Sequence, residues 1–70
     1  MTFGEALVVL MNRKGMTQTD LAAKSGVRKS TINELVKGRS KEPTLTKAKA
    51  LADALGITLQ DFIDLMDGDD

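Results

Sequence analysis

With 70 residues, 41% apolar side chains and zero formal net charge, the chain has the size and composition of one globular domain, which excludes wholesale disorder. It contains no cysteine or histidine, which excludes a disulfide framework and a thiolate metal site and removes the commonest general base, so we expect no metal, cofactor or enzymatic activity. Because no apolar run approaches membrane-spanning length and no signal-peptide pattern opens the chain, we expect a cytoplasmic protein without a membrane partner.

The zero net charge hides an uneven distribution along the chain. All ten lysines and arginines lie between residues 13 and 49, where three acids leave a net charge of +7, whereas residues 50–70 contain six aspartates and no base. Such a split predicts a polar molecule whose cationic face meets a polyanion. The alternative is a set of solvated surfaces followed by an acidic segment, and charge alone leaves both interpretations open.

The first predicted helix covers residues 3–14. Thr2 and Glu5 have the spacing of a capping box, in which each side chain accepts a hydrogen bond from the other residue's backbone N–H. Gly15 suits the left-handed residue that ends a helix. The predicted buried face has helical spacing and consists of Phe3, Leu7, Leu10 and Met11.

A second, shorter helix is predicted over residues 18–24. Thr17 is its expected N-cap, Asp20 occupies the capping-box partner position, and Gly26 follows the helix. Because this helix has barely two turns, it depends on tertiary packing for its stability.

The third predicted helix covers residues 29–37 and ends at Gly38. Its apolar stripe consists of Ile32, Leu35 and Val36. The opposite face carries Lys29, Ser30, Asn33, Glu34 and Lys37. Arg28 stands at the cap position, where the positive end of a helix disfavours a cation, so either the helix begins elsewhere or Arg28 is free to meet an anion.

Two further helices are predicted after a loop that contains Pro43. The fourth covers residues 45–55, with Thr44 as cap and Gly56 as stop, and its expected core residues are Leu45, Ala48, Leu51, Ala52 and Leu55. The fifth covers residues 59–66, and its expected core face is Leu59, Phe62, Ile63 and Met66, with Leu65 outside it. Residues 1–66 are therefore expected to form a single domain, followed by a frayed acidic tail at residues 67–70.

Two short helices joined by a glycine-containing turn fit a helix-turn-helix at about residues 17–37. The stretch TQTDLAAKSGVRKSTINELVKGRSKEPTLTKAKALADALGITLQDFI resembles the lambda-repressor-like (Cro-type, XRE-type) helix-turn-helix DNA-binding family. The residues at the family's motif positions are Gln18, Ala22, Gly26, Val27, Ile32 and Leu35. The resemblance implies an all-α, compact five-helix domain whose second and third helices form the motif and bind double-stranded DNA.

The same resemblance implies roles for individual residues. The recognition helix, at about residues 29–37, is expected to read base edges in the major groove with Lys29, Ser30, Asn33 and Glu34. The expected phosphate contacts are Thr17, Gln18, Arg28, Lys37, Arg39, Ser40 and Lys41. The alternative for this polar face is an ordinary solvated surface.

Partners and biological role follow from the family as expectations. Relatives bind partly palindromic operators as dimers, so we expect a homodimer with Leu65 and Met66 as candidate contacts. The predicted function is that of a small prokaryotic or phage transcriptional repressor or regulator. An antitoxin or restriction-modification controller that binds its own operator fits the same residues. In a different class, the fold would serve as a protein-interaction module without DNA binding, which the zero net charge favours and the basic residues of the reading face oppose.

Overall fold

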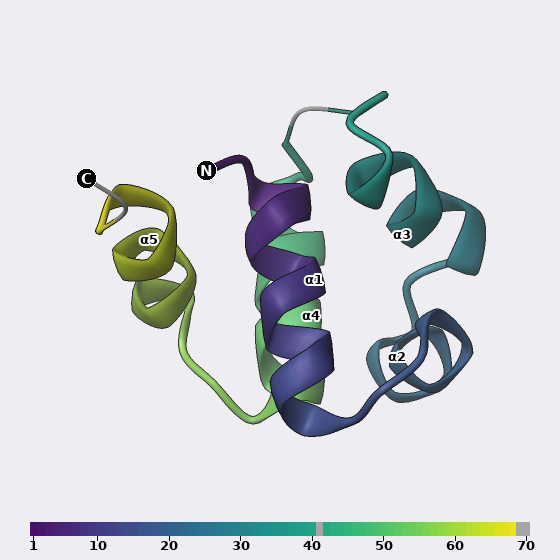
Figure 1. Ribbon diagram of the computed structural model, residues 1–70. Coiled ribbons are helices and arrows are strands. Elements are labelled where there is room, and N and C mark those ends of the chain that lie inside the picture. The colour runs from purple at the N-terminus through teal and green to yellow at the C-terminus, as the bar shows by residue number, and fades with distance from the viewer. Residues whose placement is uncertain (41, 69–70) are drawn as a thin grey trace.

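The computed structural model describes residues 1–40 and 42–68. Within them the chain forms five helices and no strand, and these are α1 (Phe3–Lys14), α2 (Gln18–Ser25), α3 (Lys29–Val36), α4 (Leu45–Leu55) and α5 (Leu59–Asp67) (Figure 1). The predicted all-α fold is confirmed. α1 and α4 have their predicted bounds, α2 and α5 each continue one residue further, and α3 ends one residue earlier because Lys37 forms its C-cap. In the described residues no helix is long and apolar enough to cross a membrane.

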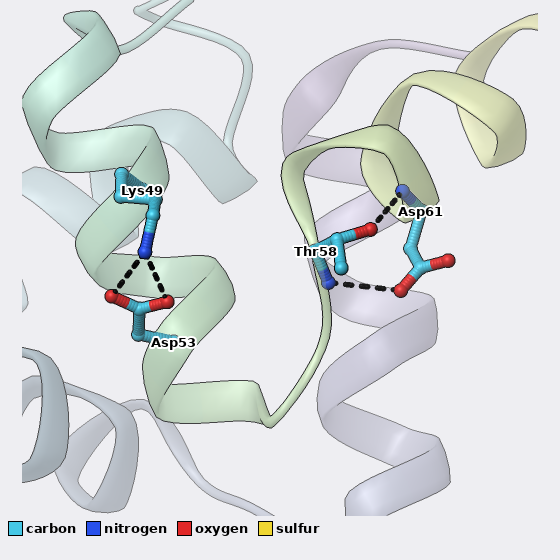
Figure 2. Close-up of polar contacts among 4 residues, drawn as sticks. All are labelled: Lys49, Asp53, Thr58 and Asp61. Carbon is cyan, nitrogen blue, oxygen red and sulfur yellow. Dashed lines mark hydrogen bonds and ion pairs between the residues drawn. The ribbon is translucent and has the colours of Figure 1, made fainter.

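Short polar motifs in the sequence fix where α1, α2, α4 and α5 begin. In the capping box of α5, the backbone N–H of Thr58 donates to Asp61 Oδ2 at 2.9 Å, and that of Asp61 donates to Thr58 Oγ1 at 3.1 Å (Figure 2). Each bond satisfies a backbone donor that the helix itself leaves unpaired. The predicted boxes Thr2–Glu5 of α1 and Thr17–Asp20 of α2 have the same reciprocal geometry. Thr44 caps α4 with a single bond from the N–H of Lys47.

The helices are arranged around a central pair. α1 and α4 occupy the middle of the molecule, α5 lies on one side of them, and α2 and α3 lie on the other (Figure 1). The rings of Phe3 and Phe62 stack with centroids 4.4 Å apart and tie α5 to α1. The largest fully buried side chains come from all five helices and are Leu7, Leu21, Ile32, Leu35, Leu51 and Phe62. Burying each such side chain contributes about 1.5–3 kcal/mol to the free energy of unfolding. The short helices therefore depend on this shared core for their stability.

Two predicted core residues lie at the surface instead. Leu45 is 75% exposed and Ile63 is 48% exposed, so the predicted buried faces of α4 and α5 were wrong at these positions. Leu45 is the first residue of α4, and the buried part of that helix begins one turn later at Ala48. In α5, Phe62 is buried and Leu65 packs half-buried against the core, although Leu65 was predicted to lie outside the apolar face. Helical periodicity indicates an apolar sector, whereas the packing of α5 on α1 and α4 decides which edge of that sector is covered.

The start of α1 lies very close to the end of α3. Gly4 is buried in the first turn of α1, and its Cα faces the backbone of Leu35. A Cβ added at Gly4 would overlap the carbonyl oxygen of Leu35 and lie 2.7 Å from its carbonyl carbon. Since these are backbone atoms, no side-chain rotation relieves the overlap. Gly4 therefore sets how closely α3 can approach the central helix.

We expect Gly4→Ala to destabilise the protein. Inside a helix, alanine ordinarily stabilises the folded state by about 1 kcal/mol relative to glycine. Overpacking against the backbone, however, destabilises it by about 1–3 kcal/mol or more. Urea unfolding measures the net effect, with Asn12→Ala, exposed on the same helix, as the control that leaves packing unchanged. A Gly4→Ala protein as stable as the Asn12→Ala protein would show that α1 and α3 are not in close contact.

Candidate nucleic-acid interface

A tight turn sets the angle between α2 and α3. Gly26 ends α2 with a φ of 75°, in the left-handed region that glycine adopts without strain. The buried side chain of Val27 anchors the turn, and its backbone N–H donates to Ser25 Oγ at 3.0 Å. The chain therefore passes from α2 to α3 within three residues and presents the start of α3 at the surface.

The N-terminus of α3 has no side-chain cap. Arg28 is the N-cap residue, with an extended backbone (φ −60°, ψ 139°), and its side chain makes no capping hydrogen bond. The helix begins at Lys29 as predicted, so Arg28 is not drawn into the helix but remains exposed beside it. Both cations stand at the positive end of the helix dipole, an arrangement that favours a nearby anion.

A side-chain hydrogen bond links the two helices of the motif. Asn33 Nδ2 in α3 donates to Gln18 Oε1 at the start of α2, over a distance of 3.2 Å, and both side chains are partly buried. The bond holds Asn33 in a defined orientation. It uses one amide hydrogen, so the second hydrogen and the carbonyl oxygen remain for the edge of a base.

The loop after α3 folds back on the last turns of the helix. The backbone N–H groups of Arg39 and Ser40 donate to the carbonyl oxygen of Glu34 at 3.0 and 3.2 Å. Arg39 Nη1 lies 3.9 Å from Glu34 Oε2, in a loose pair whose side chains are 69% and 45% exposed, so its contribution to stability is small. Glu34 Oε2 itself is shielded from solvent and accepts no hydrogen bond within the described part of the chain. A predicted base reader and a predicted phosphate contact are thus brought together.

Comparison with known families identifies the pair of helices α2 and α3 as a helix-turn-helix. A helix-turn-helix family model matches residues 9–62, which include α2, α3 and α4 entirely. The chain belongs to this helix-turn-helix family. The family is of the XRE, lambda-repressor-like type, which confirms the resemblance seen in the sequence, and its members are DNA-binding regulators and not typically enzymes. Comparison with curated proteins gives no match.

Most of the predicted site residues of the helix-turn-helix domain lie around α3. Lys29 and Ser30 are exposed on its first turn, whereas Asn33 and Glu34 are half-buried because each contacts another segment. Among the predicted phosphate contacts, Lys37 and Arg39 are exposed and Ser40 is half-buried, whereas Lys41 lies outside the described residues.

Thr17 and Gln18 lie at the start of α2, and Thr17 Oγ1 already accepts the N–H of Asp20. The predicted dimer residues, Leu65 and Met66, are half-buried on α5, on the other side of α1 and α4 from the helix-turn-helix (Figure 1).

One basic residue near the motif had no predicted role. Lys47, in α4, lines a cleft of about 290 Å³ together with Gly26, Val27, Arg28 and Thr31. Sequence alone gives no sign of this, because Lys47 lies 19 residues beyond Arg28 and belongs to another helix. Among the residues that the structure describes, no group of three or more acids could hold a metal ion.

The α2 capping box also perturbs an ionisable group. The backbone N–H of Thr17, and then its hydroxyl, hold the pKa of Asp20 below its ordinary value of 3.8, with a smaller contribution from Lys24. These bonds stabilise the carboxylate at the point where α2 positions Gln18.

We expect this capping contribution to disappear in acid. Because the folded-state pKa of Asp20 is lowered, the stabilisation is complete above the unfolded value of 3.8 and is lost as the pH falls through the folded-state pKa. An NMR titration of the Asp20 carboxyl should give a midpoint below 3.8, and Thr17→Val should raise that midpoint by removing the hydroxyl. A native midpoint at or above 3.8 would contradict the capping geometry.

Proposed function

We propose that this protein is a small prokaryotic or phage transcriptional regulator that recognises a specific duplex DNA site by placing α3 in the major groove. The observation that carries the proposal is the start of α3, where Arg28 and Lys29 stand exposed beside a helix end without a side-chain cap. Within the described residues neither cation has an ion-pair partner. A backbone phosphate of DNA would supply the missing negative charge, and the edge of a guanine would supply hydrogen-bond acceptors.

The placement of the acids supports the same orientation. Asp61, Asp64 and Asp67 are exposed on α5, which α1 and α4 separate from α3 (Figure 1). DNA bound at α3 would therefore meet the basic part of the chain while the acids stay on the other side of the domain. This arrangement allows a protein of zero net charge to bind a polyanion.

The contacts divide by chemistry into base readers and phosphate contacts. Lys29 suits the O6 and N7 acceptors of guanine, and Asn33, oriented by Gln18, suits adenine. Ser30 can contact several bases. Glu34 would accept a hydrogen bond from the N4 amino group of cytosine once its side chain separates from Arg39. The proposed phosphate contacts, which set register and affinity, are Thr17, Gln18, Arg28, Lys37, Arg39, Ser40 and Lys41.

The decisive experiment is selection of bound sequences from random duplex DNA, followed by binding at several salt concentrations. We expect an enriched site and an affinity that falls with salt. Lys29→Ala should relax the preference at one base position and cost about 1–3 kcal/mol if Lys29 reads guanine. The matched variant Lys37→Ala should weaken all sequences alike and reduce the salt dependence.

Two results would contradict these assignments. Absence of an enriched site, together with weak and salt-independent binding, would leave the fold as a protein-interaction module. Equal behaviour of Lys29→Ala and Lys37→Ala would show that the division into readers and phosphate contacts is wrong. An antitoxin or a restriction-modification controller would give the same binding results, and the neighbouring gene distinguishes these roles.

We also propose that the protein binds DNA as a homodimer on a partly palindromic site, because one domain offers few base-reading side chains. Of the predicted contacts Leu65 and Met66, Met66 lies near two apolar side chains that are exposed, Leu45 and Ile63, whereas Leu65 lines a separate cleft with Leu10 and Ile57. Met66, Leu45 and Ile63 line one groove of about 340 Å³, whose walls come from α1, α4, α5 and the segment before α4. A second copy would cover these side chains across a two-fold axis.

We expect the double substitution Leu45→Ser and Ile63→Ser to abolish cooperative binding of two protomers while leaving the folded monomer intact, since both side chains are exposed. Sedimentation of the protein–DNA complex counts the protomers. The control carries Thr46→Ser and Gln60→Ser, two exposed polar positions on the same helices. Unchanged two-protomer binding by the apolar double variant would place the dimer contact elsewhere.

A further inference from the structure

The cleft beside the start of α3 gathers positive charge from two separate helices. It has a volume of about 290 Å³ and is lined by Gly26, Val27, Arg28, Thr31 and Lys47. Arg28 belongs to the turn between α2 and α3, whereas Lys47 projects from α4, which packs against α2. The tertiary fold, and not the chain order, brings these two cations to one space.

The charges in this cleft are not neutralised by the part of the protein that the structure describes. Arg28 and Lys47 are both exposed, neither forms an ion pair there, and none of the residues lining the cleft is acidic. Lys49, two residues further along α4, does have a partner. Lys49 Nζ lies 2.6 and 2.7 Å from the two carboxylate oxygens of Asp53, one turn along the same helix (Figure 2). Lys47 therefore differs from Lys49 in having a cation and no anion beside it.

We propose that this cleft binds a phosphate of the DNA backbone, held by Lys47 from α4 and Arg28 from the motif turn. The inference rests on the proposed function and extends its interface to a third helix. Thr31 is half-buried in the same cleft and offers a hydroxyl donor. A phosphate there would relieve the repulsion between the two cations and meet the positive end of α3.

Such a contact would position α3 rather than read sequence. Phosphate contacts fix the register and orientation of a protein on the duplex. Because Arg28 directly precedes Lys29, a phosphate clamped between α4 and the turn would set how the first turn of α3 enters the groove. Lys47 is thus a positioning residue, and its loss should weaken every sequence by the same factor.

The chain provides a closely matched pair of variants to test this. Lys47→Gln and Lys49→Gln remove the same charge from exposed positions of the same helix, two residues apart. Binding to the selected duplex is measured from low to moderate salt. Each phosphate contact contributes about 0.9 to the slope of log affinity against log salt concentration. Lys47→Gln should reduce the slope by about 0.9 with unchanged base preferences, Lys49→Gln should keep the wild-type slope, and Lys47→Arg should restore it.

The possible results separate this inference from the function on which it rests. If the wild-type protein binds its site with a salt-dependent affinity but Lys47→Gln has the wild-type slope, the cleft is not a DNA contact and the proposed function stands. If the wild-type protein selects no site, the proposed function fails and the inference fails with it. Titration with inorganic phosphate, followed by amide shifts of the cleft residues, provides a second readout. Shifts that Lys47→Gln abolishes, without any change in the DNA salt slope, would assign the cleft to free phosphate and overturn the inference.

Discussion

The close packing of α3 against α1 is the constraint on which the site depends. α3 has eight residues and cannot form a stable helix alone. Its two buried side chains, Ile32 and Leu35, hold it in the common core, and the missing side chain of Gly4 lets its C-terminal turn approach the backbone of α1. With that end fixed, the turn at Gly26 and the bond from Asn33 to Gln18 orient the other end. The proposed reading face is thus supported by three different segments of the chain.

Charge is organised by the same packing. A cation at the start of a helix is unfavourable in isolation, yet Arg28 and Lys29 both occupy that place in α3. An anion bound at this helix end would explain their position, because the helix dipole and both side chains would attract the same group. The acids that balance them belong to α5, beyond the central pair of helices (Figure 1). The zero net charge therefore conceals a separation of basic and acidic residues within the fold.

The sequence predicted the helices well because its boundary signals are local. Threonine caps with acidic partners, and glycines that adopt positive φ, act within three or four residues of the helix ends. The side-chain partners within the site were harder to predict. Asn33 donates to Gln18, and Glu34 lies beside Arg39, whereas helical spacing alone placed Asn33 and Glu34 only on one polar face. These contacts depend on how a turn and a loop fold back, which spacing does not encode.

The sequence by itself determined the five helices, their caps, the helix-turn-helix family and the separation of basic from acidic segments, because each rests on local periodicity or composition. Only the tertiary structure decided which apolar residues are covered, and it left Leu45 and Ile63 exposed. It also brought Lys47 beside Arg28. The reason is that an amphipathic helix specifies an apolar sector but not its exact orientation, and the orientations of α4 and α5 are set by packing against helices distant in the chain.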